Sequence, residues 1–358
     1  MKKLLPIIIT LILTVIIGLN TQCNKPLNTE TTYGWVVGTS VSGYGTILKT
    51  ISGGIAWNRQ GDTTMIPNAD LNGVSAVSYQ TVWAVGASCA DDTGPSYGTI
   101  LHTTDGGQTW VRQGSSSSIP DVYLGNVSAV NDQIVWVVGY SGVVLKTSDG
   151  GNNWVQQAQG LLPNTEFMAV YAYDQNNVWA VGRNVGSDAV IIHTFDGGNT
   201  WNRQCETELQ GVMALIDVHA ISANTVTVVG TDHRCLVSTD SGAHWVTKTI
   251  SGIGETHING VCMTSEEDIW LAVDSDRMFF TKDAGSTWTE SHTPIRGIWH
   301  NNLNVTAINK NTVWVTCSGG GTPQGQIFYT KDRGKNWVEQ FASDSSMLRG
   351  ISIVGAFR

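Results

Sequence analysis

Three kinds of short apolar run recur along the chain, and small or polar residues bound each of them. The first reads NGVSAV, the second VWAVG and the third GTILHT, and a more polar run such as TWVRQ follows. Short runs rich in β-branched and aromatic residues, bounded by Gly, Asn, Asp or Ser, are typical of β-strands. Copies of the first run contain Val74, Val127, Val170, Val218, Val261, Val305 and Ile351, and copies of the second contain Trp35, Trp83, Trp136, Trp179, Thr227, Trp270 and Trp314.

A turn motif, TxDGGxxW, separates the third run from the fourth. Its Asp side chain is expected to accept hydrogen bonds from nearby backbone N–H groups, and the Gly two residues later permits a positive φ. We therefore interpret these carboxylates as structural rather than catalytic. Six copies carry the Asp, at Asp105, Asp149, Asp196, Asp240, Asp283 and Asp332, and a degenerate first copy, TISGGIAW, has Ser52 at that position.

Four strands per repeat at a spacing of 40–50 residues indicate a β-propeller, in which each repeat forms one antiparallel blade. The chain begins the pattern at the second strand, near Trp35, and ends on a copy of the first strand, Leu348 to Val354. The last strand must therefore complete the blade that the start of the pattern leaves short. The predicted fold is all-β, a seven-bladed propeller of four-stranded antiparallel blades over residues 32–358, closed by the C-terminal strand.

The tryptophans follow the same pattern. Of 14 Trp, seven end the turn motifs and six lie in the VWAVG-type runs, so that only Trp299 lies outside the repeat. Large rings at repeated positions are expected to fill the space between blades. We therefore interpret thirteen of them as packing residues and not as a sugar-binding stripe.

The first residues predict export. Lys2 and Lys3 precede a nearly continuous apolar run, Leu4 to Leu19, and Cys23 follows a short polar segment. This layout is typical of a signal peptide over residues 1–23, with Cys23 as the lipidation site and residues 24–31 as a polar tether. The alternatives are ordinary cleavage or an uncleaved anchor, since the run is near the short limit of a spanning helix. We expect an exported protein, periplasmic or at the outer surface and lipid-anchored to a membrane.

Composition and motifs argue against several classes of function. Without Lys2 and Lys3 the chain has 18 basic against 29 acidic side chains, a charge of −11 that argues against nucleic-acid binding. The sequence contains no CxxC spacing, HExxH motif or phosphate-binding loop, so neither a metal nor a cofactor is expected. Pairing of Cys205 with Cys235 is left open.

Histidine positions also favour structural roles. His102 and His193 occupy the strand position that Lys49 and Lys146 occupy in other repeats, which predicts a solvated side chain and not a ligand. His219 lies in an inner strand and is interpreted as a hydrogen-bonded core residue.

Irregular loops gather on one face. In a propeller the connections between strands 2 and 3 and between blades share one face, and the repeated turns share the other. Insertions at residues 87–98, 183–189, 291–302 and 317–325 all belong to the first face. Irregular loops on a rigid scaffold commonly bind a partner. The candidate binding residues are Asp91, Asp92, Arg183, Arg296, Trp299 and His300.

The turn motif is the Asp box, also called the bacterial neuraminidase repeat. VWAVG followed by GxILHTxDGGxTW, repeated seven times behind a lipoprotein-like signal, resembles the photosystem II stability/assembly factor family over residues 32–358. The resemblance implies a seven-bladed propeller without enzymatic activity and a chaperone-like role on membrane-protein subunits. Family members in phototrophs are expected to have an arginine-rich patch, whereas here only Arg59, Arg112 and Arg203 recur two positions after a box Trp. We expect a monomer that binds a protein partner, reaching the membrane only through its lipid anchor.

The alternative is a glycoside hydrolase or carbohydrate-binding protein of the sialidase or xyloglucanase type, because those proteins share the Asp box. Most glycosidases need two carboxyl groups across a cleft. The acids outside the boxes, including Asp217 and the run Glu266 to Asp268, do not occupy matching positions in different repeats. The sequence therefore favours a binding protein over an enzyme.

Overall fold

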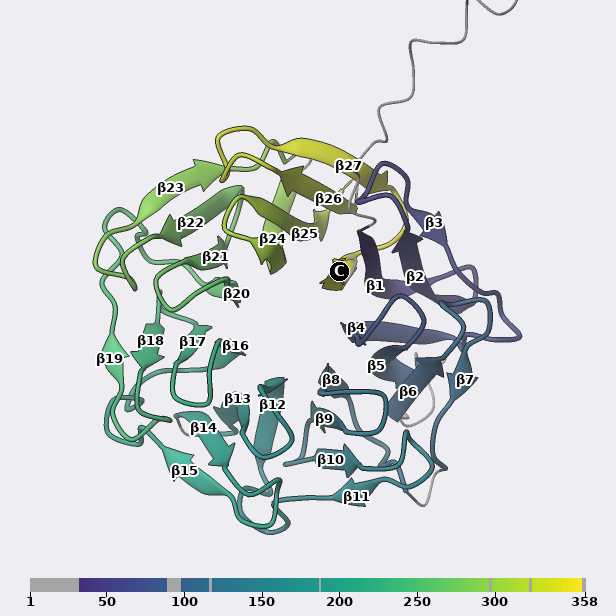
Figure 1. Ribbon diagram of the computed structural model, residues 1–358, viewed down its shortest axis with the longest axis horizontal. Helices are drawn as coiled ribbons and strands as arrows, with labels where there is room; N and C mark the ends of the chain where they lie inside the picture. The colour runs from purple at the N-terminus through teal and green to yellow at the C-terminus, as the bar shows by residue number, and fades with distance from the viewer. Residues whose placement is uncertain are drawn as a thin grey trace, which may run out of the picture. The chain divides into compact units, whose positions relative to one another are not determined.

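The computed structural model describes residues 32–88, 98–115, 118–186, 188–295, 298–321 and 324–355, with the backbone alone at residues 298–300 and 302. Seven four-stranded antiparallel sheets form a ring, as Figure 1 shows. This arrangement confirms the predicted all-β, seven-bladed propeller. No helix in the described ranges is long and apolar enough to span a membrane.

The blades follow one another along the chain, each running outward from the centre of the ring. Blades 1 to 4 consist of β28 (Leu348–Val354), β1 (Tyr33–Val41), β2 (Tyr44–Thr50) and β3 (Asn58–Arg59); β4 (Ala69–Ala76), β5 (Val82–Ser88), β6 (Gly98–Thr103) and β7 (Val111–Arg112); β8 (Leu124–Ala129), β9 (Val135–Gly139), β10 (Val144–Thr147) and β11 (Val155–Gln156); β12 (Thr165–Ala172), β13 (Val178–Asn184), β14 (Ala189–Thr194) and β15 (Asn202–Gln204). Blades 5 to 7 consist of β16 (Leu215–Ala220), β17 (Val226–Gly230), β18 (Cys235–Ser238) and β19 (Val246–Thr247); β20 (Ile258–Met263), β21 (Ile269–Val273), β22 (Arg277–Thr281) and β23 (Thr289–His292); β24 (Ile298–Asn309), β25 (Thr312–Gly320), β26 (Gly325–Thr330) and β27 (Val338–Ser343).

The C-terminal strand closes the ring, as the sequence predicts. β28 pairs antiparallel with β1, placing Trp35 opposite Ser352 and Val36 opposite Ile351. Leu348, at the start of β28, is fully buried between blade 1 and blade 7. Strands from the two ends of the described chain thus form one blade, and no blade is left with three strands.

Tryptophans pack between neighbouring blades. The six in the VWAVG-type strands are almost completely inaccessible to solvent. Three of them meet the box Trp of the following blade edge to face, at centroid distances of 5.9 Å for Trp83 and Trp154, 5.7 Å for Trp136 and Trp201 and 6.2 Å for Trp270 and Trp337. Edge-to-face pairs at these distances are favourable beyond their buried area. The packing role predicted for the repeated tryptophans is therefore confirmed.

The strand-3 side chains opposite these tryptophans are buried or half-buried, whereas the sequence predicts solvated ones. His193 is buried and stacks on Trp179 at 4.1 Å, and its burial lowers its pKa to about 4. Lys146 instead lies 5.0 Å over Trp136 and donates from Nζ to the Gly197 carbonyl in the next box turn, at 2.7 Å. His102 and Lys49 repeat the two arrangements in blades 2 and 1. Both side chains suit this position: the lysine ammonium makes a cation–π contact with the Trp ring, and the flat neutral imidazole stacks on it.

The box turn has the geometry that a structural carboxylate requires. Asp196 accepts hydrogen bonds from the backbone N–H of Thr200 at 2.9 Å and from the hydroxyl groups of Thr200 and Thr194 at 2.6 and 2.8 Å. The bonds from Thr200 are the main reason that the pKa of Asp196 falls to about 2. Gly198 has a φ of 95°, in the region that favours glycine. In the degenerate first box the Ser52 hydroxyl accepts from the N–H of Ala56 instead, at 3.3 Å.

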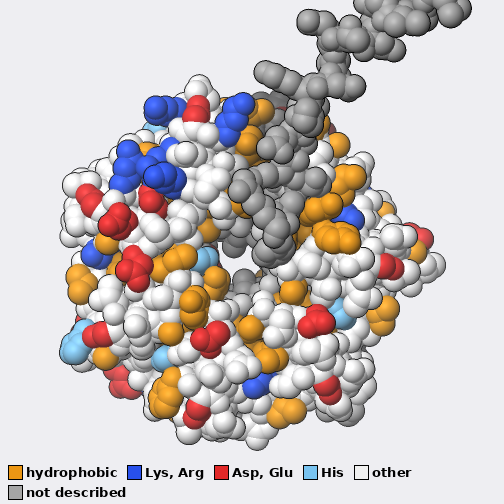
Figure 2. Space-filling view, viewed as in Figure 1, with side chains coloured by type: hydrophobic (Ala, Val, Ile, Leu, Met, Phe, Trp, Pro, Cys, Tyr) orange, Lys and Arg blue, Asp and Glu red, His pale blue; other side chains and the backbone are white. Residues whose placement is uncertain are grey.

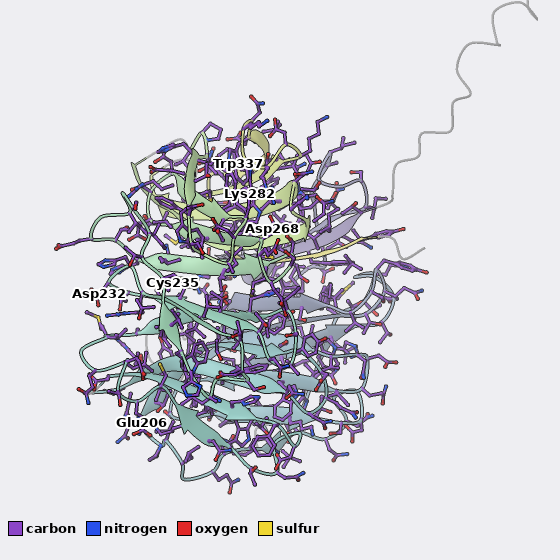
Figure 3. All side chains as sticks on the ribbon, turned by 60° about the vertical axis from the view of Figure 1, so that its left-hand side comes forward. Glu206, Asp232, Cys235, Asp268, Lys282 and Trp337 are labelled. Atoms are coloured by element: carbon purple, nitrogen blue, oxygen red, sulfur yellow. The ribbon has the colours of Figure 1, made fainter. Side chains whose placement is uncertain are left out.

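The described cysteines are free. Cys205 and Cys235, whose pairing the sequence leaves open, form no disulfide, and Cys235 (labelled in Figure 3), Cys262 and Cys317 are buried. Cys23 and Cys89 lie outside the described residues.

Candidate binding face

The ring has two different faces. The turns within strand pairs 1–2 and 3–4, including every Asp box, form one face, which we call the turn face. The connections between strands 2 and 3 and between successive blades form the other, the loop face. Figure 2 shows the turn face.

The structure locates only part of the predicted loop cluster. Asp91, Asp92 and Arg296 lie outside the described residues. Trp299 and His300 belong to β24 and not to a loop, because β24 begins at Ile298 and pairs with the far end of β25. Within the predicted loops 291–302 and 317–325, residues 298–302 thus belong to β24 and residues 317–320 to β25. The side chains of Trp299 and His300 are not described, so their binding role stays a prediction.

Arg183, the remaining candidate, forms an ion pair on the loop face. Its guanidinium Nη2 lies 2.6 Å from Oε2 of Glu166, the residue opposite it on β12, and Nε donates to the same oxygen at 2.7 Å. The Arg183 side chain is 41% exposed and that of Glu166 is 18% exposed. The guanidinium therefore keeps donors available to a partner while its orientation is held by the carboxylate.

A second ion pair and two tyrosines continue this feature across neighbouring blades. Arg349 of β28 donates to Asp70 of β4 at 3.2 Å and also to the side chain of Asn72. Between the two ion pairs, the rings of Tyr123 and Tyr140 lie 4.7 Å apart, each partly exposed.

We call the set Asp70, Tyr123, Tyr140, Glu166, Arg183 and Arg349 the polar arc. Burial raises the pKa of both tyrosines, and the charges of Glu166, Arg183 and Arg349 act on Tyr140. The arc joins blades 1 to 4 on the loop face, and its two acids and two arginines balance in charge. Tyr and Arg are the residue types that most often dominate protein interfaces.

Apolar side chains border the arc at blade 4. Val185 is 59% exposed and Met213 is 58% exposed. The backbone links their loops, because Ala189, at the start of β14, donates to the carbonyl of Val212 at 2.7 Å. The loop face of blades 3 and 4 thus presents aromatic, charged and apolar groups.

The recurring arginines after the box Trp do not form a patch. Arg59 donates to the Val41 and Tyr44 carbonyls at 3.0 and 3.1 Å, and Arg112 donates to the Gly98 carbonyl at 3.2 Å. Each carbonyl belongs to the strand 2–3 hairpin of the same blade. Gln156 fills the same role in blade 3, donating to Gly142 at 3.3 Å. These side chains are therefore links within their blades.

A narrow tunnel passes through the centre of the ring. Its cavity of about 170 Å³ is lined by the innermost strand of every blade. Ser75 and Ser128 accept hydrogen bonds from the backbone of the next blade, at Ala129 and Ala172, both at 3.0 Å. These bonds satisfy the inner strand edges, which is a structural function.

Blades 4 to 6 depart from this serine pattern. Asp217 accepts from the backbone N–H of Val261 at 2.9 Å, and burial raises its pKa to about 7. Burial also lowers the pKa of His219 to about 4, and its ring lies 4.4 Å from that of Tyr171. The His219 Nδ1 has no hydrogen-bond partner among the described residues, so the expected hydrogen-bonded core histidine is wrong in that respect.

The acids of the loop face and the tunnel described above interact with other groups. Asp70 and Glu166 are paired with arginines, and Asp217 is engaged by the backbone inside the tunnel. Three or more His, Cys, Asp or Glu side chains positioned to hold a metal are likewise absent from the described ranges.

The arc includes residues that the sequence analysis missed. Tyr123, Tyr140 and Arg349 did not stand out because they lie at the edges of repeated strands. The only sequence signal was that Tyr140, directly after VWVVG, differs from the residues at that place in the other repeats.

Two family models match parts of the chain. One is described as the photosynthesis system II assembly factor YCF48 and matches residues 121–216, and the other is described as sortilin, neurotensin receptor 3, and matches residues 233–347. No curated protein matches the sequence.

Solved structures share the fold. YCF48 bound to a D1 peptide superposes with a TM-score of 0.56 at 21% identity, over 76% of this chain and 81% of that one. YCF48 from Cyanidioschyzon merolae superposes with a TM-score of 0.55 at 20% identity, over 76% of this chain and 85% of that one. The GH74 enzyme from Niastella koreensis superposes with a TM-score of 0.56 at 13% identity, over 87% of this chain and 66% of that one. The YCF48 family model and the two YCF48 structures confirm the resemblance to photosystem II assembly factors, whereas the GH74 match shows a shared fold.

Proposed function

We propose, from the premise that this chain is an Asp-box propeller similar to the photosystem II assembly factors, that it is a non-catalytic scaffold whose loop face binds a protein partner. The observation that carries the proposal is the polar arc, in which Tyr123, Tyr140, Arg183 and Arg349 come together from blades 1, 3 and 4. The similar YCF48 structure contains a D1 peptide, which supports a protein segment as the ligand.

The chemistry of the arc favours an extended polypeptide with an acidic or amide-rich segment. Arg183 and Arg349 each keep guanidinium donors beyond those used by Glu166 and Asp70, and guanidinium groups bind carboxylates and carbonyls well. The tyrosines offer rigid ring area at a low cost in side-chain entropy. Val185 and Met213 would cover an apolar side chain next to the charged segment. A membrane-protein subunit with a polar tail outside the membrane would meet these requirements.

Cross-linking in the native host tests the proposal. Full-length tagged protein is cross-linked and captured, and partners are quantified by mass spectrometry for the parent chain, Tyr140→Ala and Arg183→Ala. Hot-spot truncations cost about 2 kcal/mol or more, so capture of the main partner should fall roughly 30-fold.

The matched control is Arg203→Ala, because Arg203 also lies on blade 4 and faces Glu206 at 3.5 Å, but on the outer strand β15. It should capture the partner as the parent does. Equal capture by all three variants would remove the arc from the interface. A single membrane-complex subunit among the partners would support the assembly-factor role.

The second candidate function is glycoside hydrolysis, favoured by the match to the GH74 enzyme. Turnover of xyloglucan or a sialoside by the purified chain would establish it. Its absence, together with specific capture of one protein, would favour the scaffold.

Trp299 remains a separate test of the same face. As an interface anchor, Trp299→Ala would weaken capture by about 2 kcal/mol or more and leave the melting temperature nearly unchanged. If the Trp299 side chain instead fills space between blades, the same substitution would lower the free energy of unfolding by roughly 3–5 kcal/mol.

The proposed location is outside the cytoplasm, on a lipid anchor at Cys23. Mass spectrometry of the mature N-terminus decides this: a diacylglyceryl Cys23 supports the anchor, and an unmodified start elsewhere contradicts it.

A further inference from the structure

Blades 7 and 1 make the turn face cationic and apolar at their junction. Lys310, Lys331 and Lys335 project from the two turns of blade 7, and all three are exposed. None of them has an ion pair within the described part of the chain. Beside them, in the degenerate box of blade 1, Ile55 is 86% exposed and Ile51 is 60% exposed. We call these five residues the 7–1 patch.

A hollow joins the two halves of the 7–1 patch. Gly54 and Ile55 of blade 1 line it on one side, and Lys331, Asp332 and Val338 of blade 7 line it on the other. Its volume is about 410 Å³. Lys331 and Ile55 therefore border one hollow, which connects the lysine side of the patch with its isoleucine side.

The charge of the 7–1 patch is opposite to that of the molecule. The chain as a whole has a net charge of −9. The two turns of blade 7 have four cations, the three lysines and Arg333, against the single carboxylate Asp332. The blade 1 box adds no charge because Ser52 replaces the Asp. Figure 2 shows Lys and Arg side chains gathered toward the upper left of this face, where Figure 1 places blades 6 and 7.

Blade 6 limits the cationic surface. Its 1–2 turn contains Glu266, Glu267 and Asp268, and Asp268 forms an ion pair with Arg333 across the blade junction. Figure 3 labels Asp268, Lys282 and Trp337 around this junction. Lys282, in the box turn of blade 6, is exposed and has no ion pair within the described residues, so the free cations extend from blade 7 to the blade 6 box, and the exposed isoleucines of blade 1 lie beside those of blade 7.

The described chain begins at this same place. The carbonyl of Thr32 accepts a hydrogen bond from the N–H of Gly53, in the blade 1 box turn, at 2.9 Å. The start of the described chain therefore lies on the turn face, at blade 1.

We propose that the 7–1 patch docks on the surface of an anionic lipid membrane. Lysines beside exposed apolar side chains are what an interfacial membrane site requires, since the ammonium groups attract lipid headgroups while the isoleucines enter the headgroup region. Docking in this way turns the loop face away from the lipid. The polar arc then remains free for a partner, so this proposal goes beyond the protein-binding role and does not depend on it.

Lysine footprinting on vesicles tests the proposal. Full-length protein is reconstituted into vesicles of phosphatidylcholine alone, or of phosphatidylcholine with one third phosphatidylglycerol, and acetylation rates are measured for each lysine. Lys331 and Lys335 should acetylate severalfold more slowly on the anionic vesicles, and 0.5 M salt should abolish that difference. Lys248, on blade 5, serves as the internal reference and should react equally on both.

Three double variants, one of them a control, separate docking from mere attachment through the N-terminus. Each lysine near an anionic surface contributes roughly fivefold in affinity, so Lys331→Gln/Lys335→Gln should shift the docked-to-free ratio about 25-fold. The charge-matched control, Arg203→Gln/Lys248→Gln, should leave protection of Lys310 unchanged. Ile51→Ser/Ile55→Ser tests the apolar half and should also reduce protection of the lysines.

Two results would overturn the lipid assignment. Equal acetylation of Lys331 and Lys335 on neutral and anionic vesicles would show that the patch does not meet the lipid. The second result combines two observations on the Ile51→Ser/Ile55→Ser variant. If its lysines are protected as fully as those of the parent, both by a polyanion such as heparin and on anionic vesicles, the patch is a simple anion site.

Discussion

Removing the C-terminal strand gives the sharpest test of the closed ring. Deleting residues 347–358 leaves blade 1 with three strands and exposes β1, which β28 otherwise covers from Tyr33 to Gly38. The deletion also removes Ser352, whose hydroxyl accepts from the N–H of Ala76 in blade 2 at 3.1 Å. Both edges of the gap would then present unpaired backbone groups.

The magnitude follows from what β28 buries. Leu348 is 0%, Ile351 6% and Val354 8% exposed. Burying an aliphatic side chain of this size contributes about 1.5–3 kcal/mol, so the three give roughly 5–9 kcal/mol. A domain has a total stability of about 5–15 kcal/mol. The truncated protein should therefore be insoluble or melt far below the full chain.

Thermal and urea unfolding, followed by Trp fluorescence and circular dichroism, provide the assay. Leu348→Ala keeps the strand and should lower the free energy of unfolding by about 2–5 kcal/mol. This point variant keeps the test possible if the deletion protein does not express. Removing only residues 355–358 is the matched control, because it leaves β28 whole, and it should leave the melting temperature unchanged. A protein lacking residues 347–358 that melts like the full chain would refute closure by β28.

Three further variants test individual interactions. Lys146→Met breaks the bond to the next box turn and the contact with Trp136 and should cost about 1–2 kcal/mol in urea unfolding, whereas Lys248→Met should cost little. Burial raises the pKa of Asp217 from 3.8 to about 7, so its stabilising contribution is complete below pH 4 and lost as the pH rises to 7; Asp217→Asn should flatten that part of the profile of melting temperature against pH. Hydrogen bonds lower the pKa of Asp196 from 3.8 to about 2, so its contribution to stability is present above pH 4 and lost toward pH 2. An Asp196→Asn protein whose melting temperature falls with acid as steeply as that of the parent would contradict this.

The sequence predicted the parts of the fold that depend on local repetition. Each blade repeats the same strand pattern and each box its own turn, so the number of blades and the closure by Leu348–Val354 could be counted directly. The strand-3 prediction failed for His193 because sequence variation alone does not reveal exposure. The ring of Trp179 accepts either a lysine or an imidazole in that position, and the resulting stack is buried.

The remaining errors come from contacts between distant segments. Residues 298–302 lack a clear strand pattern and extend β24 because β25 is there to pair with, as Asn301 does with Ser318. The polar arc unites Arg349, near the end of the chain, with Tyr123 and Arg183 more than 160 positions earlier. Ring closure brings them together, and no local pattern records that.

The seven copies of each position provide a physical criterion for choosing between scaffold and function. After the box Trp, the side chains of Arg59 and Gln156 differ in charge, yet both bond to carbonyl groups in the hairpin of their own blade. Such a substitution keeps a structural role, because the blade itself supplies the hydrogen-bond acceptor. Tyr140 and Arg183 differ from their counterparts too, and each also has a partner in its own blade, Tyr123 and Glu166. The charges of Glu166 and Arg183 in blade 4 nevertheless act on Tyr140 in blade 3, and both side chains remain partly open to solvent. A side chain that interacts across a blade junction and keeps exposed surface is available for recognition, and this distinction, more than the presence of arginine alone, directs attention to the loop face of blades 1 to 4.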